Sequence, residues 1–272
     1  MTTGTRLDGR ELARRLRRDV AARLEAMASQ GVALPVPTLG LVAVDVHPGT
    51  RRFVALKERA FHGAGLEVRT RILPSDADTG AVTDALAGLA ADPAIHGLFL
   101  QYPLPSTVDV RACVAAIPLA KDVDASGPAA EALLREGRPR HVPGTPAAIL
   151  RLLDASGADL IARGVTLVAV EGAVGEGTAA LLRHRGVPVR VVRPDAPDVA
   201  AAVGEASVLV TSAGRPGAVS GRWIGDGAVV VDAGYHHPGG AGDIVPAPDS
   251  ARLDAWAPPR GGVGPLTVAQ LM

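Results

Sequence analysis

The chain has 272 residues, 47% of them hydrophobic, which is enough for one large domain or two modest domains with buried cores. Acidic and basic residues balance at 28 each, so no net field draws the chain to nucleic acid or to an anionic membrane. A small-molecule function is therefore the first expectation.

The cysteine count and the N-terminal sequence bear on the compartment. Cys113 is the single cysteine, which excludes an internal disulfide framework, and we interpret it as a structural residue in a reducing cytoplasm. The first residues are charged and lack an apolar core, and nowhere do about 18 apolar residues run together. We therefore expect a cytoplasmic protein that is neither exported nor membrane-spanning.

The cations are almost all arginine, with 26 arginines against two lysines, Lys57 and Lys121. A desolvated lysine can shift its pKa and exchange a proton, whereas arginine stays charged. Both lysines are therefore candidates for chemistry, and the alternative is that each is an ordinary surface cation.

The elements predicted in the first half alternate between helix and strand. Residues 9–31 place apolar side chains every three or four positions before a glycine, which predicts an amphipathic helix. There follow a strand over 37–46, a helix over 50–66, a strand over 66–73, a helix over 78–93 and a buried strand over 95–105. This alternation predicts parallel β/α units.

A second series follows a segment rich in proline and glycine, residues 121–153, which becomes helical and suits a domain boundary. Strands are expected at 167–170, 187–192, 208–211 and 228–232. Two α/β halves with glycine turns predict, by fold analogy, a substrate domain and a nucleotide domain with a site in the cleft between them.

Residues 165–182 read as strand, glycine turn and helix, a pattern that usually holds a phosphate. The turn, EGAVGEG (171–177), has the spacing G-x-x-G-x-G rather than G-x-G-x-x-G. A nucleotide-triphosphate loop fits poorly, because Thr178 stands where that loop requires lysine. Glu171 and Glu176 lie beside the glycines, and a carboxylate there would repel a pyrophosphate unless it points away.

Two stretches in the first half carry polar residues in apolar elements. In TRRFVALKERA (50–60), the residues Thr50, Phe53 and Lys57 share one face of the predicted helix. The alternative is a helix that buries Phe53 while Lys57 reaches water. Gln101 lies at the C-terminal end of an apolar strand, the position at which α/β proteins usually form their binding sites. A buried glutamine there needs hydrogen-bond partners.

Two later stretches add carboxylates and glycines. In KDVDA (121–125), Asp122 and Asp124 alternate along an expected extended segment and so point opposite ways, one of them toward the cleft. Residues 260–265 hold three glycines and a proline, which indicates either an unusual backbone path or an ordinary loop before a helix.

Taken in order, these stretches resemble the bifunctional methylenetetrahydrofolate dehydrogenase/methenyltetrahydrofolate cyclohydrolase family over almost the whole chain. The matching motifs are QYPLP (101–105) against Q-L-P-L-P, KDVDA (121–125) against K-D-V-D-G, PGTP (143–146) against P-C-T-P and GGVGPLT (261–267) against G-G-V-G-P-M-T. GRWIGDGAVVVDAG (221–234) and Gly242-Asp243-Ile244 resemble two further motifs of the family.

The resemblance implies a two-domain α/β fold. A folate-binding catalytic domain would span 1–142, completed by 258–272, and a Rossmann-like NAD(P)-binding domain would span 143–257. The implied reactions are oxidation of 5,10-methylenetetrahydrofolate with NADP, or alternatively NAD, and hydrolysis of the methenyl product to 10-formyltetrahydrofolate. The implied setting is one-carbon metabolism and purine biosynthesis, in a cytoplasmic homodimer that binds tetrahydrofolate derivatives and neither nucleic acid, metal nor membrane.

On this resemblance, Lys57 is the catalytic lysine, Gln101 the glutamine that hydrogen-bonds it, and Asp124 the aspartate that holds the pterin ring. Further substrate contacts are implied for Thr50, Phe53, Tyr102, Pro103, Gly262, Val263, Gly264 and Pro265. Phe53 replaces the family's tyrosine, so a ring can still stack on the substrate but the hydroxyl is missing. Hydride transfer needs positioning alone, whereas hydrolysis needs proton transfers that suit a lysine. Lys121 is assigned no chemistry.

The implied coenzyme contacts are Glu171, Gly172, Ala173, Gly175, Arg193, Gly214, Pro216 and Tyr235. The family's turn reads about G-R/A-S-x-x-V-G-x-P, so this turn is one residue shorter and lacks the serine and the proline. Arg193 would pair with a 2′-phosphate and favour NADP, whereas Asp195 would bond a 2′-hydroxyl and favour NAD, and both stay open. Tyr235 is bulkier than the usual aliphatic residue and is expected to narrow the nicotinamide pocket.

Three other functions stay open. The first is an enzyme that retains one activity, in particular a cyclohydrolase alone. The second is a folate-binding or scaffolding relative without turnover, and the third is a Rossmann dehydrogenase for another substrate. The family normally continues beyond the position of Met272 into a fuller helix, so we expect either a naturally short end or a shortened chain.

Overall fold

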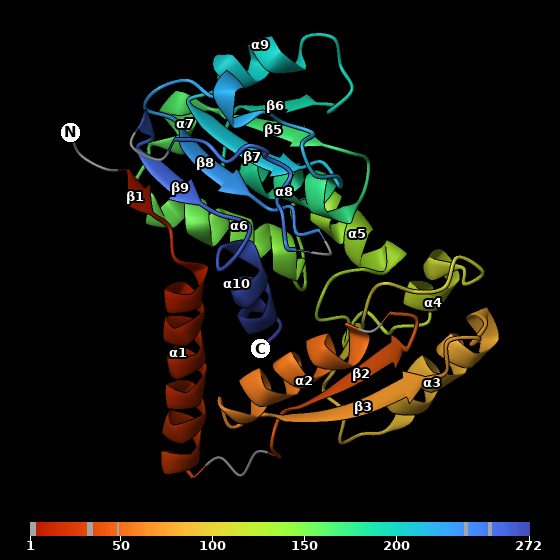
Figure 1. The fold of residues 1–272 in the computed structure, drawn as a ribbon. Coiled ribbons are helices and arrows are strands. Elements are labelled where there is room, and N and C mark those ends of the chain that lie inside the picture. The colour runs from red at the N-terminus through yellow and green to blue at the C-terminus, as the bar shows by residue number, and fades with distance from the viewer. Residues whose placement is uncertain (1–3, 32–34, 48, 237–238, 250–251) are drawn as a thin grey trace. The chain divides into compact units, whose positions relative to one another are not determined.

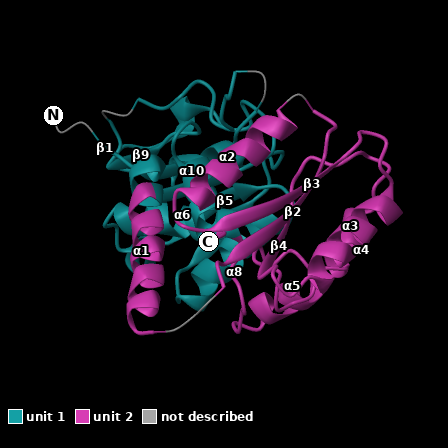
Figure 2. Ribbon diagram, turned by 90° about the horizontal axis from the view of Figure 1, so that it is seen from below, with its two compact units in different colours: residues 1–13, 144–270 teal, residues 14–143, 271–272 magenta. Residues whose placement is uncertain are grey.

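The computed structural model describes residues 4–31, 35–47, 49–236, 239–249 and 252–272. Its internal contacts divide the chain into two compact units, which Figure 2 colours separately. Unit 1 comprises residues 1–13 and 144–270, and unit 2 comprises residues 14–143 and 271–272. Helix α1 (Gly9–Ser29) begins in unit 1 and continues into unit 2.

Unit 2 is built on a three-stranded parallel sheet in the order β3-β2-β4. Its strands are β2 (Thr38–Val44), β3 (Glu67–Leu73) and β4 (Gly97–Leu100). Its helices are α2 (Thr50–His62), α3 (Thr79–Ala91), α4 (Val110–Ala115) and α5 (Pro128–Arg135). The central strand β2 is buried along its whole length, as the apolar sequence predicts for a strand covered on both faces.

The two faces of this sheet carry separate core clusters. One cluster joins α2 to the odd-numbered positions of β2 and β4: Leu39, Leu41, Ala43, Val54, Phe61 and Phe99. The other joins α3 to the even-numbered positions: Val42, Val44, Val82, Leu86, Leu98 and Leu100. The period of two along the strands therefore places α2 and α3 on opposite faces and turns Phe99 toward α2.

Unit 1 is built on a six-stranded parallel sheet in the order β1-β9-β8-β7-β5-β6. Its strands are β1 (Thr5–Arg6), β5 (Val165–Ala169), β6 (Val189–Val192), β7 (Val208–Ser212), β8 (Val229–Asp232) and β9 (Ala255–Ala257). Its helices are α6 (Gly144–Ala155), α7 (Leu160–Arg163), α8 (Ala173–His184), α9 (Val199–Gly204), the 3-10 turn η1 (Gly221–Trp223) and α10 (Val263–Gln270). Figure 1 shows α6, α8 and α10 on one face of the sheet and α9 on the other.

The strand order of unit 1 reverses beside β5. Strand β6 follows β5 in the chain and pairs with one side of it, whereas β7 pairs with the other side. In open parallel sheets, ligands bind at the carboxyl ends of the strands where the order reverses. The residues after β5 and β7, among them Gly172 and Gly214, follow the two strands at this point.

The expected α/β class with parallel sheets is confirmed, and helices and strands of both predicted β/α series are present. Two local expectations are wrong. The strand expected over 95–105 ends at Leu100. Of the extended conformation expected for KDVDA, only Asp122 forms a bridge, to Leu98; Lys121, Val123 and Asp124 are in turns, and Asp122 accepts hydrogen bonds from the backbone N–H groups of Ser126 and Gly127.

Within the described ranges, none of the helices combines the length and apolar character that crossing a membrane requires.

Candidate active site

Lys57 and Gln101 form the centre of the candidate site in unit 2. Lys57 projects from α2 with only 7% of its surface exposed, and its Nζ donates a hydrogen bond to Gln101 Oε1 at 2.6 Å. The backbone N–H of Gln101 donates to the Val42 carbonyl at 2.8 Å, and its Nε2 donates to the Tyr102 carbonyl. Both ends of the amide are engaged, which fixes Oε1 toward the lysine. The alternative in which Lys57 reaches water is wrong.

Burial lowers the pKa of Lys57 from 10.5 to about 8. The negative charge of Asp124 acts in the opposite direction, because it favours the ammonium, but its effect is smaller. Nζ also lies 4.9 Å from the centroid of the Phe99 ring, within the range of a cation–π contact. The amine and the ammonium are therefore both populated close to neutral pH. A side chain in this state can accept a proton and return it.

The two aspartates of KDVDA have different surroundings. Asp122 is buried, with 1% of its surface exposed, and accepts hydrogen bonds from the backbone N–H groups of Gly127 at 2.8 Å and Ser126 at 3.1 Å. It therefore fixes the turn that leads into α5. Asp124 is half-buried, and its charge acts on Lys57. Of the two, Asp124 is the carboxylate next to the lysine.

The other predicted substrate residues of unit 2 lie on the same elements. Thr50 begins α2 and is 1% exposed, and its Oγ1 is buried without a hydrogen-bond partner among the described residues. Phe53, half-buried, follows one turn later. Tyr102 is 41% exposed and is followed by the exposed Pro103. Burial and the charge of Asp124 raise the pKa of Tyr102 to about 12, so its hydroxyl keeps its proton at neutral pH.

Of the predicted C-terminal contacts in unit 1, Gly262 precedes α10, and its first turn holds Val263, Gly264 and Pro265. The backbone that leads into the helix requires glycine. Gly261 has a φ of +85°, and a Cβ on Gly262 would lie 2.4 Å from the Pro258 carbonyl oxygen. Because these residues belong to unit 1 and Lys57 to unit 2, their proximity to the lysine stays a prediction.

Lys121 and Cys113 have structural contacts. Lys121 Nζ donates to the carbonyl oxygens of Ala90 at 2.7 Å and Asp92 at 3.0 Å, so it binds the C-terminal end of α3. Cys113 is fully buried, and burial raises the pKa of its thiol, which makes the thiolate less available. Neither residue has the environment of a catalytic group.

The glycine turn of unit 1 connects β5 to the N-terminus of α8. Gly172 has a φ of +145°, a conformation that L side chains rarely adopt, and the exposed Ala173 begins the helix. A Cβ on Gly175 would lie 2.8 Å from the Cβ of Ala169, so this glycine allows α8 to pack closely on β5. That is the part played by the third glycine of a dinucleotide turn.

The carboxylates of the turn have partners. The side chain of Glu171 is 89% exposed, and its Oε1 lies 3.2 Å from Arg193 Nη1. Arg193 Nε in turn contacts Asp195 Oδ1 at 3.1 Å. Glu176 Oε1 accepts a hydrogen bond from the backbone N–H of Gly172 at 3.3 Å. The structure thus brings Glu171 of the turn into contact with Arg193, the residue expected to bind the 2′-phosphate on the coenzyme ribose.

The remaining coenzyme candidates follow β7 and β8. Gly214 has a φ of +72°, and Pro216 two residues later is exposed. Tyr235 follows β8 with 47% of its surface exposed. All three therefore come after the carboxyl ends of neighbouring strands of the sheet.

Two buried aspartates, which the sequence places in motifs but to which it assigns no role, hold the Tyr235 segment. Asp232, 1% exposed, accepts hydrogen bonds from the backbone N–H groups of Gly234, Asp243 and Ile244 and from the hydroxyl of Thr211. Asp243, fully buried, accepts from the Ala213 N–H at 2.6 Å and contacts His236 Nε2 at 2.8 Å. Burial raises the pKa of Asp232 to about 6. The signal available in the sequence is a carboxylate at the end of an apolar strand, VVVD.

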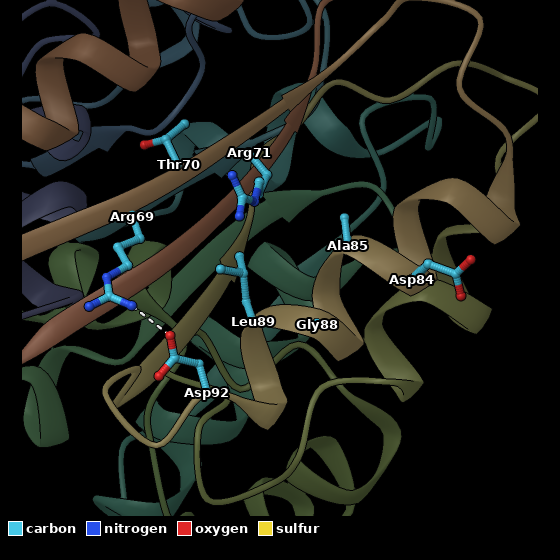
Figure 3. Close-up of a pocket in the computed structure, with 8 residues that line it drawn as sticks. All are labelled: Arg69, Thr70, Arg71, Asp84, Ala85, Gly88, Leu89 and Asp92. Carbon is cyan, nitrogen blue, oxygen red and sulfur yellow. Dashed lines mark hydrogen bonds and ion pairs between the residues drawn. The ribbon is translucent and has the colours of Figure 1, made fainter.

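A separate cavity of about 520 Å³ lies between β3 and α3 in unit 2 (Figure 3). Its lining residues are Arg69, Thr70, Arg71, Asp84, Ala85, Gly88, Leu89 and Asp92. An ion pair of 2.5 Å joins Arg69 to Asp92 at this cavity. None of the predicted site residues lines it, and in the described part of the chain no three His, Cys, Asp or Glu side chains are grouped to hold a metal ion.

Comparison with known proteins identifies the family of both halves. The model of the tetrahydrofolate dehydrogenase/cyclohydrolase catalytic domain matches residues 7–124, and the model of its NAD(P)-binding domain matches residues 143–272. The bifunctional protein FolD of Acidiphilium cryptum is 36% identical over 272 residues, which cover 98% of this chain and 94% of the relative. The FolD of Saccharophagus degradans is 34% identical over 267 residues, with the same coverage of 98% and 94%.

Solved structures agree with the family models. The Trypanosoma brucei methylenetetrahydrofolate dehydrogenase-cyclohydrolase, complexed with NADP and an inhibitor, superposes with a TM-score of 0.90 at 29% identity, over 100% of this chain and 95% of that one. The FolD of Campylobacter jejuni superposes with a TM-score of 0.90 at 25% identity, over 98% and 95%. The resemblance inferred from the sequence is confirmed: the chain belongs to the tetrahydrofolate dehydrogenase/cyclohydrolase family.

Proposed function

We propose that this chain oxidises 5,10-methylenetetrahydrofolate to 5,10-methenyltetrahydrofolate with NADP and hydrolyses the product to 10-formyltetrahydrofolate. The observation that carries the proposal is the buried Lys57–Gln101 pair, in which the lysine has a pKa of about 8. Relatives named as bifunctional enzymes that align with 98% of the chain support both reactions. The NADP complex of the Trypanosoma brucei relative supports NADP as the coenzyme.

The oxidation asks for positioning rather than for an acid or a base. Loss of hydride from the methylene carbon leaves an amidinium that two nitrogens stabilise, so no proton moves in this step. The bound coenzyme would supply the hydride acceptor. We assign the pterin to Asp124 and the aromatic parts of the substrate to Phe53 and Tyr102, with Thr50 and Pro103 beside them.

The hydrolysis requires two proton transfers. Water forms a C–O bond to the amidinium carbon and loses one proton, which the neutral Lys57 amine accepts. The C–N5 bond then breaks, its electron pair remains on N5, and the hydroxyl proton of the adduct passes to N5. The net products are 10-formyltetrahydrofolate and one proton. Gln101 holds the lysine nitrogen in place through both steps, and an arginine could not exchange the proton.

The coenzyme domain contains the features that a dinucleotide requires. The turn after β5 lies where the strand order reverses, and Gly175 permits close packing of α8, whose N-terminal N–H groups favour a pyrophosphate. We propose coenzyme contacts from Glu171, Gly172, Ala173, Gly175, Arg193, Gly214, Pro216 and Tyr235. Arg193 would bind the 2′-phosphate of NADP by releasing its contacts with Glu171 and Asp195.

We further propose that residues 1–142 bind folate and residues 143–257 bind the coenzyme. The segment 258–272 would complete the folate domain through Gly262, Val263, Gly264 and Pro265. Residues 258–270 pack within unit 1, so this contribution is a prediction about the liganded enzyme.

We also propose that the chain acts as a cytoplasmic homodimer that supplies formyl groups for purine biosynthesis. Strand β6 is an edge of its sheet, and Val191 on it is 49% exposed, which offers a surface to a second copy. Size-exclusion chromatography with light scattering is expected to give twice the chain mass of 27.7 kDa. A monomer at micromolar concentration contradicts the homodimer.

A spectrophotometric assay of the purified protein tests the two activities. With methylenetetrahydrofolate and NADP, we expect NADPH and 10-formyltetrahydrofolate to form together, and the same assay with NAD compares the coenzymes. Absence of both products contradicts the proposal. Hydrolysis of added methenyltetrahydrofolate without any reduction of NADP or NAD would leave a cyclohydrolase alone.

A further inference from the structure

The ring of Phe99 lies against the ammonium of Lys57. Nζ is 4.9 Å from the ring centroid, and the same nitrogen donates to Gln101 Oε1 at 2.6 Å. Phe99 and Gln101 are two residues apart at the end of β4, so their side chains point to the same face, the one covered by α2. Phe99 and Gln101, two positions apart at one strand end, thus each supply a contact to the Lys57 nitrogen.

The position of the ring is fixed by the core. Phe99 is 8% exposed and belongs to the cluster that includes Leu41 and Phe61. Side chains in such a cluster are close-packed and occupy defined rotamers. The ring face is therefore a permanent part of the lysine's surroundings.

An aromatic face distinguishes the two protonation states of a lysine. The ring face is electron-rich, so it attracts an ammonium, whereas a neutral amine gains little from it. Lys57 is 7% exposed, and burial disfavours its charged form. An aliphatic side chain at position 99 would fill similar space without attracting the charge. The ring opposes the effect of burial.

Other charged and titratable groups come from the described elements around Lys57. Asp124, from the turn at 121–124, favours the ammonium through its charge. Burial raises the pKa of Tyr102, in the segment after β4, to about 12, so this hydroxyl is uncharged at neutral pH. On α2 itself, Glu58 accepts a hydrogen bond from Thr70 on β3 at 2.6 Å. Among the described residues, Phe99 and Asp124 thus both favour the charged lysine.

We propose that Phe99 is a positioning residue for hydrolysis: its ring face holds the Lys57 ammonium in place and raises the pH at which the lysine gives up its proton. The effect keeps a larger share of Lys57 in the ammonium form close to neutral pH. The relevance to hydrolysis rests on the proposed function of Lys57, whereas the effect on its titration does not.

Lysine titration by NMR tests the inference directly. The sequence has two lysines, so lysine labelled with ¹³C at Cε gives two side-chain signals, and the signal absent from Lys57→Met belongs to Lys57. The wild-type midpoint is expected near 8. In Phe99→Leu it is expected to fall by roughly 0.4–1.5 pH units. Phe61→Leu, which removes a buried ring from the same cluster, is the matched control and is expected to leave the midpoint unchanged.

Pentafluorophenylalanine at position 99 provides a second variant of nearly the same shape, in which the ring face no longer attracts a cation. It is expected to lower the midpoint as Phe99→Leu does, and to move the pH profile of methenyl hydrolysis in the same direction. An unchanged or raised midpoint in these variants overturns the inference, whatever the activity. If the midpoint falls in these variants but the wild type does not hydrolyse methenyltetrahydrofolate, the effect of Phe99 on the titration is supported and the proposed function is contradicted.

Discussion

Lys57 on α2 and Gln101 after β4 are separated by 44 positions in the chain, yet a hydrogen bond of 2.6 Å joins their side chains in the buried part of unit 2. The pair ties the helix to the sheet and at the same time keeps a titratable amine in surroundings that lower its pKa to about 8. Burial of this lysine costs stability and supplies a proton acceptor, which is typical of functional sites.

The stability of the wild type relative to Lys57→Met is expected to depend on pH. The pKa of Lys57 is about 8 in the folded chain and 10.5 without burial, so the unfolded chain binds more protons between these values. The free energy of unfolding therefore rises with pH in this window, and the cost of burial is fully present below it. From pH 8 to pH 10 the free energy of unfolding of the wild type is expected to rise by about 2 kcal/mol relative to that of Lys57→Met. Urea unfolding at each pH measures the difference, and parallel pH curves for the two proteins would refute it.

Glu171→Gln is expected to tighten the binding of NADP. The substitution removes one of the two carboxylates that contact Arg193, and the arginine becomes more available to a 2′-phosphate. Because the group is exposed, the gain is expected to be about two- to fivefold in affinity, with NAD binding unchanged. Calorimetric titration with both coenzymes measures it. Glu176→Gln removes a carboxylate from the same turn that contacts Gly172 instead, and it serves as the control. Equal effects on NAD and NADP would exclude Arg193 as the reader of the phosphate.

Lys121→Ala is expected to destabilise the protein without changing turnover. It removes two hydrogen bonds to carbonyl oxygens at the C-terminal end of α3, at Ala90 and Asp92. The expected loss is about 1–3 kcal/mol in the free energy of unfolding. Thermal or urea unfolding measures it, and Lys121→Arg, which keeps a cation at this position, should recover part of the loss. A fall in kcat of Lys121→Ala with stability unchanged would mean that this lysine takes part in the chemistry.

The sequence was informative where the interactions are local. The apolar periods of α2, β5 and α8 predicted these elements because the period follows directly from backbone geometry. The scarcity of lysine directs attention to Lys57 and Lys121, since an amine can exchange a proton that arginine keeps, but composition alone does not separate the catalytic candidate from the structural one.

Other parts depend on contacts between distant positions and could not be predicted. Asp122 accepts hydrogen bonds from N–H groups further along the chain, and the residues beside it are in turns, whereas alternation alone indicates an extended segment. In the sequence, Phe99 is one more apolar residue of a buried strand, and nothing in that run shows which side chain lies over its ring. Glu171 could be placed near the coenzyme turn, but its contact with Arg193 on the neighbouring strand end required the fold.

The most direct test of the account compares the two half-reactions in the wild type and in Lys57→Met. The oxidation depends on positioning and the hydrolysis depends on the lysine, so the variant is expected to form NADPH from methylenetetrahydrofolate at a rate within about tenfold of the wild type. It is expected to hydrolyse methenyltetrahydrofolate at least about a hundredfold more slowly, so the methenyl intermediate accumulates. Hydrolysis by Lys57→Met at the wild-type rate, or no NADPH from the wild type, would contradict the account.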